Sequence, residues 1–302
     1  MNPQFLADGL LMGAMIGLGA IGVTLTYSIL RFANFAHGEF ITWGAYGTLA
    51  ISGAIGFAGG RGMGAIGPFS FGWPVILAGL AAAVLTGLLA LALDLLLFAR
   101  LRAKGTAIIM VMASFGASMA LRSLCEFFFT SGPRYFSRDI QIAREILPGM
   151  RLTPDQLLMI ALTGLLVAAM HLLMTRTTLG RAMRAVSENP SLAGVVGIDV
   201  DVIVRATWLI GGELAAAAGV MSGIVVQIRP FMGFDLLLPL FAAAILGGIG
   251  SVPGAVLGGL IVGLAEAAAV PLIGAQFRAA IAFLLIIAVL LLRPTGIFGV
   301  RE

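Results

Sequence analysis

The sequence predicts an all-α integral membrane protein, a polytopic bundle of about eight or nine transmembrane helices, some of them broken. Hydrophobic residues make up 60% of the 302 positions and charged residues only 11%, whereas a soluble domain carries about a quarter charged residues. These charges are too few to cover a surface that faces water, so the chain must face lipid. The apolar runs are also far longer than barrel strands and lack their alternation, which leaves helices as the spanning structure.

Nine apolar segments are candidates to cross the hydrocarbon core, which takes about 20 helical residues. In chain order they cover residues 5–30, 40–58, 73–99, 106–129, 156–174, 202–226, 236–250, 253–270 and 277–292. The seventh segment is short, and the eighth is interrupted by glycines. We expect the whole chain, residues 1–302, to form a single transmembrane domain.

The short basic loops predict the orientation, because such loops stay on the inner side of the membrane. An outer N-terminus and an inner C-terminus place these arginines inside: Arg31, Arg100, Arg102, Arg176, Arg181, Arg184 and Arg293. Residues 130–155 then form an outer loop of mixed charge, and residues 175–201 form an inner loop.

Several function classes are excluded by the residue inventory. The basic residues are scattered singly with no aromatic platform, which argues against nucleic acid as a partner. A single cysteine, Cys125, allows no intrachain disulfide, and two distant histidines give no metal site. No phosphate-binding G-x-x-x-x-G-K-[ST] motif and no recognisable nucleophile are present. The chain is therefore predicted to bind no cofactor and to catalyse no reaction.

The six residues NFAHGE, 34–39, interrupt the apolar sequence after the first predicted helix. Gly38 permits unusual backbone geometry, while Asn34, His37 and Glu39 supply donors and acceptors for backbone groups that a broken helix leaves free. Irregular backbone at membrane depth is tolerated where it is buried in protein or lines a cavity. Two interpretations remain open: a structural polar network, or part of a substrate pathway.

A second break is predicted within residues 246–259, LGGIGSVPGAVLGG. Its glycines are spaced one residue too widely for a dinucleotide-binding turn, and a membrane helix follows. We interpret it as a connection between two membrane helices, with break or packing roles for Gly247, Gly248, Gly250, Pro253 and Gly254. Gly9, Gly13 and Gly17 share one face of the first helix, where they let another helix approach closely.

Ionisable residues inside predicted spans are costly and therefore face the bundle interior or a water path. Glu213 lies in the middle of the sixth span, which makes it a pathway candidate. Arg122 and Glu126 are four residues apart and are predicted to pair, either as a structural ion pair or in a pathway. Asp94, His171 and Glu266 lie nearer the span ends and are predicted to be structural or interfacial.

The inner loop carries the signature of a short capped helix. Asn189 suits the N-cap, Pro190 the first helical position and Gly197 the C-terminal cap. A helix over residues 190–196 is too short to span a membrane. It is either a plain surface turn or a docking element for a cytoplasmic partner.

Four stretches resemble one known family in order along the chain: NFAHGE, TTLGRAMRAVSENPSLAGVVGID, LGGIGSVPGAVLGGLIVGLAEA and the closing RPTGIFG. They resemble the membrane permeases of branched-chain (hydrophobic) amino acid ABC importers, and are closer to the shorter of the two permeases. The resemblance covers about residues 17–299, although Arg-Phe-Ala at residues 31–33 departs from the glycine and methionine expected there.

The resemblance implies a permease of the bacterial inner membrane that works with a second homologous permease, two cytoplasmic ATPases that bind ATP, and a periplasmic binding protein. It also implies that the inner loop couples to the ATPases through Gly180, Arg181, Arg184, Glu188, Asn189, Pro190, Ala193, Gly194 and Gly197. A path for a zwitterion with an apolar side chain needs a few polar groups, and the candidates for this substrate pathway are Asn34, His37, Glu39 and Glu213. Two alternatives stay open: a urea or short-amide importer of the same kind, and an ion-coupled secondary transporter.

Overall fold

A computed structural model describes residues 3–59, 64–102, 105–137, 141–293 and 295–298. Within this part of the chain, eight helices are long and apolar enough to cross a membrane, and a ninth apolar helix is shorter. The predicted all-α membrane fold is therefore confirmed. Residues 138–140 of the predicted outer loop, and Pro294 and Gly299 of the closing motif, lie outside the described residues.

The first half of the chain forms four long helices. Its elements are α1 (Gln4–Leu30), α2 (His37–Gly59), α3 (Trp73–Leu93), η2 (Asp94–Phe98), α4 (Ala99–Arg102) and α5 (Ala107–Phe129). The π-helical turn η2 joins α3 to α4, so the third span runs without interruption over Trp73–Arg102.

The second half begins with a two-stranded hairpin and continues with helices. Its elements are β1 (Arg144–Leu147), β2 (Met150–Leu152), α6 (Pro154–Arg176), α7 (Thr178–Glu188), α8 (Pro190–Val195), α9 (Val200–Val225), α10 (Met232–Gly247), α11 (Val252–Ile273), η3 (Ala275–Phe277) and α12 (Arg278–Leu292). Helix α10 is the predicted short seventh segment, displaced toward the N-terminus. Helix α7 was not predicted; the Thr177 side chain caps its first turn.

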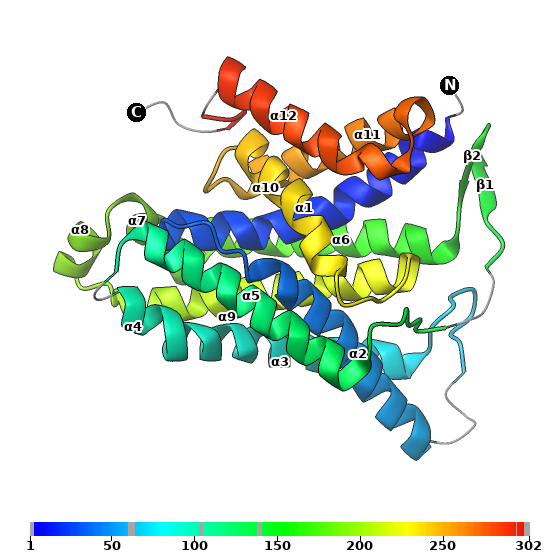
Figure 1. The fold of residues 1–302 in the computed structure, drawn as a ribbon, viewed down its shortest axis with the longest axis horizontal. Helices are drawn as coiled ribbons and strands as arrows, with labels where there is room; N and C mark the ends of the chain where they lie inside the picture. The colour runs from blue at the N-terminus through cyan, green and yellow to red at the C-terminus, as the bar shows by residue number, and fades with distance from the viewer. Residues whose placement is uncertain (1–2, 60–63, 103–104, 138–140, 294, 299–302) are drawn as a thin grey trace.

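The bundle has two distinct ends, with the β1–β2 hairpin at one and α7 and α8 at the other (Figure 1). Helix α1 connects them. At the hairpin end, the Gln4 side chain exchanges two hydrogen bonds with the backbone of Arg151 in β2, at 3.1 and 2.8 Å. At the α8 end, the Arg31 guanidinium donates to the Ser187 carbonyl. Below, these are called the hairpin end and the α8 end.

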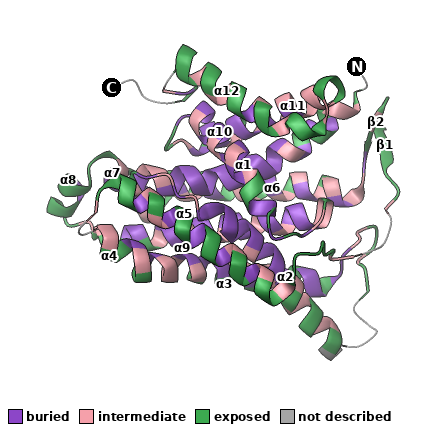
Figure 2. Ribbon diagram, viewed as in Figure 1, coloured by how far each residue is buried: buried purple, intermediate pink, exposed green. Residues whose placement is uncertain are grey.

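Helix α1 is the centre of the bundle and the most buried of its long helices (Figure 2). Its glycines face α11: a Cβ at Gly13 would lie 2.8 Å from the Leu260 Cα, and one at Gly9 would lie 2.9 Å from the Leu264 Cα. The two backbones are thus as close as they can be, and the predicted glycine face packs helix on helix.

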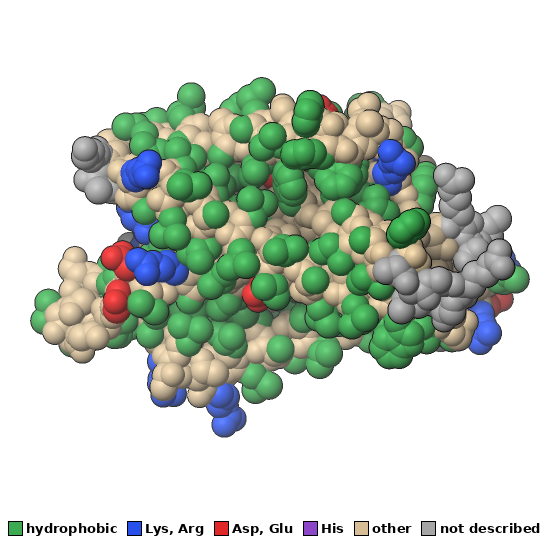
Figure 3. Space-filling model, turned by 90° about the horizontal axis from the view of Figure 1, so that it is seen from below, with side chains coloured by type: hydrophobic (Ala, Val, Ile, Leu, Met, Phe, Trp, Pro, Cys, Tyr) green, Lys and Arg blue, Asp and Glu red, His purple; other side chains and the backbone are tan. Residues whose placement is uncertain are grey.

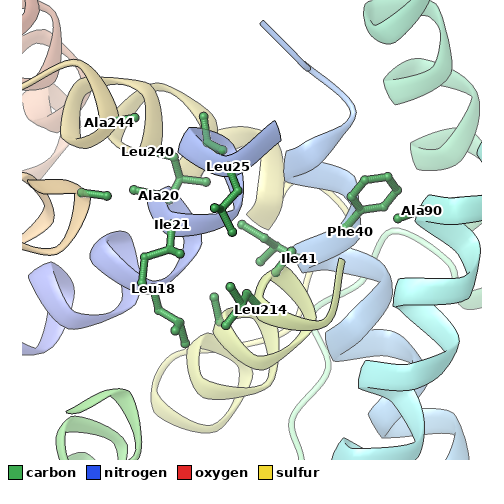
Figure 4. Close-up of a cluster of buried hydrophobic side chains, with 14 of the residues drawn as sticks. Leu18, Ala20, Ile21, Leu25, Phe40, Ile41, Ala90, Leu214, Leu240 and Ala244 are labelled. Carbon is green, nitrogen blue, oxygen red and sulfur yellow. The ribbon is translucent and has the colours of Figure 1, made fainter. Parts of the chain in front are cut away.

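Apolar side chains from four helices fill the interior beside α1. Leu18, Ile21 and Leu25 of α1 lie near Ile41 of α2, with α9 and α10 close by (Figure 4). The bundle is thus tied together by large aliphatic side chains in the middle and by glycines where backbones touch.

The outer surface matches a lipid environment. Hydrophobic side chains cover most of the face in Figure 3, and most charged side chains on that face lie toward the two ends of the long axis. Large apolar side chains such as Leu284 and Leu291 of α12 are exposed, as expected where lipid is the solvent.

Candidate functional site

The first helix break lies inside the bundle rather than at its surface. Residues 31–36 are not helical, and Arg31 ends α1 in a left-handed conformation with φ 59°. His37, the first residue of α2, places its ring Nε2 3.2 Å from the carbonyl oxygen of Gly19 in α1. Roughly 16 Å of helix rise separates Gly19 from the end of α1. Helix α2 therefore begins deep in the bundle, which confirms the predicted break.

Short polar contacts satisfy the backbone that the break leaves free. The Asn34 side-chain oxygen accepts from the Ala36 N–H at 3.1 Å, and the Asn34 carbonyl accepts from the His37 N–H at 3.3 Å. Across the break, the Phe35 N–H donates to Ser114 Oγ in α5 at 3.1 Å. Asn34 thus has the turn-forming role expected of its side chain.

A buried ion pair joins α2 to α5 just beyond the break. The Arg122 guanidinium donates to Glu39 Oε1 at 2.7 Å, and Ser118 Oγ donates to the same oxygen at 2.9 Å. Glu39 is fully buried. The rings of Phe231 and Phe234 lie 4.9 and 4.2 Å from the Arg122 guanidinium carbon.

The predicted pairing of Arg122 with Glu126 is wrong. Among the described residues, the acid within ion-pair distance of Arg122 is Glu39. The physical reason is burial: a carboxylate taken fully out of water requires a counter-charge, so the guanidinium turns toward α2 instead of along its own helix.

Asn34, His37 and Glu39 are brought together as predicted, but they are enclosed. Their relative exposures are 3%, 1% and 0%, and none lines a pocket described below. Gly22 makes room for the imidazole, since a Cβ there would lie 2.5 Å from His37 Cε1. In this conformation the three side chains belong to a structural network at the break, in which Asn34 bonds within the turn, His37 bonds to α1 and Glu39 bonds to α5.

Glu213 does not join this network. On α9, Gly211 faces α1, and Glu213, two residues further, faces the opposite way toward Gly87 of α3. Its carboxylate borders a separate, largely apolar pocket of about 570 Å³ between α3, α6 and α9. The sequence correctly placed Glu213 near the middle of its span, but it could not predict which side of α9 carries the residue.

Two adjoining pockets lie near the hairpin end and are together called the hairpin-end cavity below. Their volumes are about 370 and 750 Å³, and both are lined by Met12, Met15, Val226, Glu266 and Arg278. Gln4 and Asp8, at the start of α1, line the smaller pocket, and Phe35 of the helix break lines the larger. The cavity therefore extends from the hairpin end toward the break.

The other ionisable residues named from the sequence have different surroundings. Asp94 is buried and pairs with Arg102, and His171 is exposed, so both fit the structural or interfacial prediction. Glu266 is only 5% exposed and borders the cavity. Arg278 was not singled out from the sequence. The sequence does contain a signal for it: an acid, Glu266, lies in one predicted span, and Arg278 lies at the start of the next.

The capped helix of the inner loop is confirmed at the α8 end, one residue shorter than predicted. Asn189 Oδ1 accepts from the Leu192 N–H at 3.0 Å, and Pro190 starts the helix. Gly197 follows with φ 90°. Ala193 points inward with 3% exposure, whereas the larger apolar residues point outward: Leu192 is 60%, Val195 84% and Val196 68% exposed.

The other residues of the predicted coupling segment are of two kinds: Gly180 is buried, and the rest are exposed. Gly180 packs directly against the backbone at Leu173 and Met174, where a Cβ has no room. The exposed ones are Arg181, Arg184, Glu188, Asn189, Pro190, Gly194 and Gly197.

The second predicted break is the turn between α10 and α11, close to the α8 end. Gly248 and Gly250 adopt φ of 95° and 91°, which favour glycine. The Gly250 N–H donates to Thr24 Oγ1 of α1 at 2.8 Å, and Ser251 caps α11 by accepting from the Gly254 N–H at 3.1 Å. Pro253 lies in the first turn of α11, and Gly247 packs against Gly254. The turn thus connects two membrane helices, as predicted.

Comparison with known proteins gives consistent relatives over the full length. Residues 5–291 match the family described as "branched-chain amino acid transport system / permease component". The chain is 34% identical over 304 residues to the high-affinity branched-chain amino acid transport system permease protein BraD of Pseudomonas aeruginosa, covering 99% of this chain and 96% of that relative. It is 31% identical over 316 residues to the permease protein LivH of Escherichia coli, which is named for the same kind of system, covering 100% and 99%.

Among solved structures, PsaBC from Streptococcus pneumoniae in complex with Fab gives a TM-score of 0.48 at 10% identity, covering 96% of this chain and 92% of that chain. The family assignment depends on the sequence matches, which extend over the break, the cavity helices and α8 alike. The chain belongs to the permease component family of branched-chain amino acid transport systems, and it is a multi-pass membrane protein of the transport machinery rather than an enzyme.

Proposed function

We propose that this chain is the inner-membrane permease subunit of an ATP-driven importer that translocates branched-chain amino acids delivered by a periplasmic binding protein. The observation that carries the proposal is α8. In a member of this permease family, it presents Leu192, Val195 and Val196 outward at one end of the bundle. An apolar face beyond the membrane helices supports a protein partner at that end.

The proposed importer has further subunits beside this chain. The sequence of this chain has no phosphate-binding loop, and in the proposal ATP is bound and hydrolysed by two cytoplasmic ATPase subunits. A second, homologous permease completes the transmembrane part. The hairpin end is periplasmic and receives the binding protein, while the α8 end is cytoplasmic. The chain accordingly starts outside and ends inside.

Helix α8 is placed to transmit motion from an ATPase into the bundle. Its inward residue Ala193 is buried, and the Ile198 N–H donates to the Ala193 carbonyl at 3.0 Å just before α9 begins. Helix α9 in turn packs along α1, α2 and α3. A displacement of α8 would therefore reach the helices that surround the break.

The substrate pathway in this proposal runs from the hairpin-end cavity past the break. Phe35 lines the cavity, and its sequence neighbours Asn34, His37 and Glu39 are buried and do not line it. These three residues supply polar groups that become accessible if the break rearranges during transport. Glu213 borders the separate pocket between α3, α6 and α9 and is therefore not part of this pathway.

Replacing Gly194 with tryptophan is expected to uncouple ATP hydrolysis from transport while leaving the subunit folded. A Cβ at Gly194 meets nothing within 4 Å, so the bulky side chain disturbs no contact within this chain and protrudes toward the partner. ATPase activity of the purified complex and amino acid uptake into proteoliposomes are measured together.

Gly164→Trp is the matched control, because a Cβ there also meets nothing within 4 Å and Gly164 lies in the middle of α6, outside the α8 segment. We expect that control to retain normal coupling. Normal uptake by Gly194→Trp would contradict the coupling role of α8.

The proposed function is tested by purifying the chain from its native membrane in mild detergent and identifying the proteins that accompany it. Two ATPases and a second permease are expected, and the reconstituted complex should import leucine, isoleucine and valine with ATP and the binding protein. Competition by urea but not by leucine would identify the urea or amide alternative. Uptake by this chain alone, driven by an ion gradient, would identify a secondary transporter.

A further inference from the structure

Two opposite charges face the hairpin-end cavity without pairing with each other. Glu266 lies in α11 and Arg278 starts α12, and both line both of the adjoining pockets. The Glu266 side chain is buried, and its Oε1 has no hydrogen-bond partner among the described residues. The Arg278 Nε is also buried and has no partner there. The ion pairs found in the described part of the chain do not include either residue.

The other charges around the cavity are already engaged. Asp8 accepts a hydrogen bond from the Gln4 side chain at 3.1 Å. Arg229 and Asp235 form an ion pair with each other at 3.0 Å. Within the part of the chain that the structure describes, Glu266 is therefore the buried acid of this cavity without a hydrogen-bonded partner for its Oε1, and Arg278 lies close enough to act on it electrostatically without forming an ion pair.

The rest of the cavity wall is apolar and adaptable. Met12 and Met15 of α1 and Val226 after α9 line both pockets, and Phe283 of α12 lines the larger. Thioether side chains adjust to irregular apolar shapes, which suits branched aliphatic groups. The smaller pocket, about 370 Å³, lies within the range of small-molecule sites.

We propose that Glu266 and Arg278 bind the two charges of an amino acid zwitterion at the periplasmic entrance. The Glu266 carboxylate receives the α-ammonium group and the Arg278 guanidinium receives the α-carboxylate, while the side chain lies against Met12, Met15 and Val226. The proposal builds on the proposed import function and assigns the recognition site that it requires. Charge-assisted hydrogen bonds to both ends of the substrate select amino acids, and the methionine wall selects apolar side chains.

The position of the site fits the first contact in import. Helix α11 brings Ala267, next to Glu266, against Gly9 of α1, near the hairpin end. Phe35, which belongs to the helix break, also lines the larger pocket. A substrate held by Glu266 and Arg278 thus lies between the periplasmic entrance and the break.

The test uses the assembled permease and ATPase subunits in nanodiscs. The binding protein is left out, so that selectivity is measured on the permease itself. Met12→Cys serves as the reporter, because Met12 lines both pockets and the native Cys125 is fully buried. Labelling of the introduced cysteine by a thiol reagent is measured by mass spectrometry against increasing leucine. The probes are leucine, leucinol, which lacks the carboxylate, and 4-methylpentanoate, which lacks the ammonium group.

We expect leucine to slow labelling, with Glu266→Gln and Arg278→Gln each raising the protecting leucine concentration by about tenfold or more. Arg278→Gln should leave protection by leucinol unchanged, and Glu266→Gln should leave protection by 4-methylpentanoate unchanged. Arg278→Lys should restore part of the leucine protection, because a cation remains. Asp8→Asn is the matched control, because Asp8 is an exposed acid that lines the same cavity. Leucine should protect the cysteine in this variant at the same concentration as in the parent.

Equal protection by leucine in the parent, Glu266→Gln and Arg278→Gln would overturn the proposed site, as would an equal response of all three probes to both substitutions. Leucine import by the parent complex, with binding protein and ATP, is measured in the same preparation. If the parent imports leucine and the substitutions change nothing, this inference alone fails. If the parent complex imports no branched-chain amino acid, the proposed function fails.

Discussion

Replacing Arg122 with glutamine should remove most of the correctly folded permease from the membrane. The substitution leaves the Glu39 carboxylate fully buried beside the helix break, with Ser118 as its remaining donor. Removing one partner of a buried ion pair costs about 3 to 5 kcal/mol, because the other charge is left uncompensated. The loss is expected in the melting temperature of the purified protein in detergent and in its yield of monodisperse material.

The double variant Glu39→Gln/Arg122→Gln separates charge from packing. With both charges removed, no uncompensated ion stays buried, so stability should recover above that of Arg122→Gln alone. Glu126→Gln is the matched control: this acid lies on the same helix but is not the partner of Arg122, and its loss should change the melting temperature little. A larger loss in Glu126→Gln than in Glu39→Gln would contradict the observed pairing.

Gly13→Leu is the second substitution with a large expected effect. A Cβ at Gly13 would lie 2.8 Å from the Leu260 Cα and 3.0 Å from the Gly259 carbonyl oxygen, and neither backbone atom can move aside locally. Because α1 packs along α11 over much of its length, the two helices must separate to admit the side chain. Overpacking of this kind costs about 3 kcal/mol, the upper part of the usual range, and Gly13→Ala should already show part of the loss.

The measurement is the melting temperature of the isolated chain in detergent, which removes any influence of partner subunits. Gly116→Leu on α5 is the matched control, since a Cβ there meets nothing within 4 Å. If Gly13→Leu melts at the temperature of the control, α1 and α11 do not pack as closely as described.

The sequence predicted the local features whose causes are local. The apolar segments, the break at residues 34–39, the turn around Gly250 and the helix capped by Asn189 all depend on hydrophobic length or on the backbone preferences of single residues. These preferences act within a few positions along the chain, so one sequence is enough to find them. Helix α7 was missed because capping residues were recognised in that loop only around residues 189–197, although Thr177 caps α7 in the same way.

Pairings between helices could not be predicted in the same way. Spacing on one helix favoured Arg122 with Glu126, yet the guanidinium reaches across to Glu39, because burial of that carboxylate outweighs proximity along the chain. Glu213 was placed at the correct depth but on an unknown face. Arg278 was not recognised as a site residue, since its place on the same cavity as Glu266 depends on how α11 packs on α1 and α12 on α11.

The sequence by itself determined that this protein is a helical membrane protein with a capped helix beyond its spans, because hydrophobic length and capping are properties of contiguous residues. The permease family was indicated by the resemblance of four motifs. Only the tertiary structure decided which charges meet and which remain free. Helix rotation and crossing are set by contacts between distant residues, such as the glycines of α1 with the backbone of α11. That packing buries Glu39 against Arg122 and leaves Glu266 and Arg278 facing one cavity.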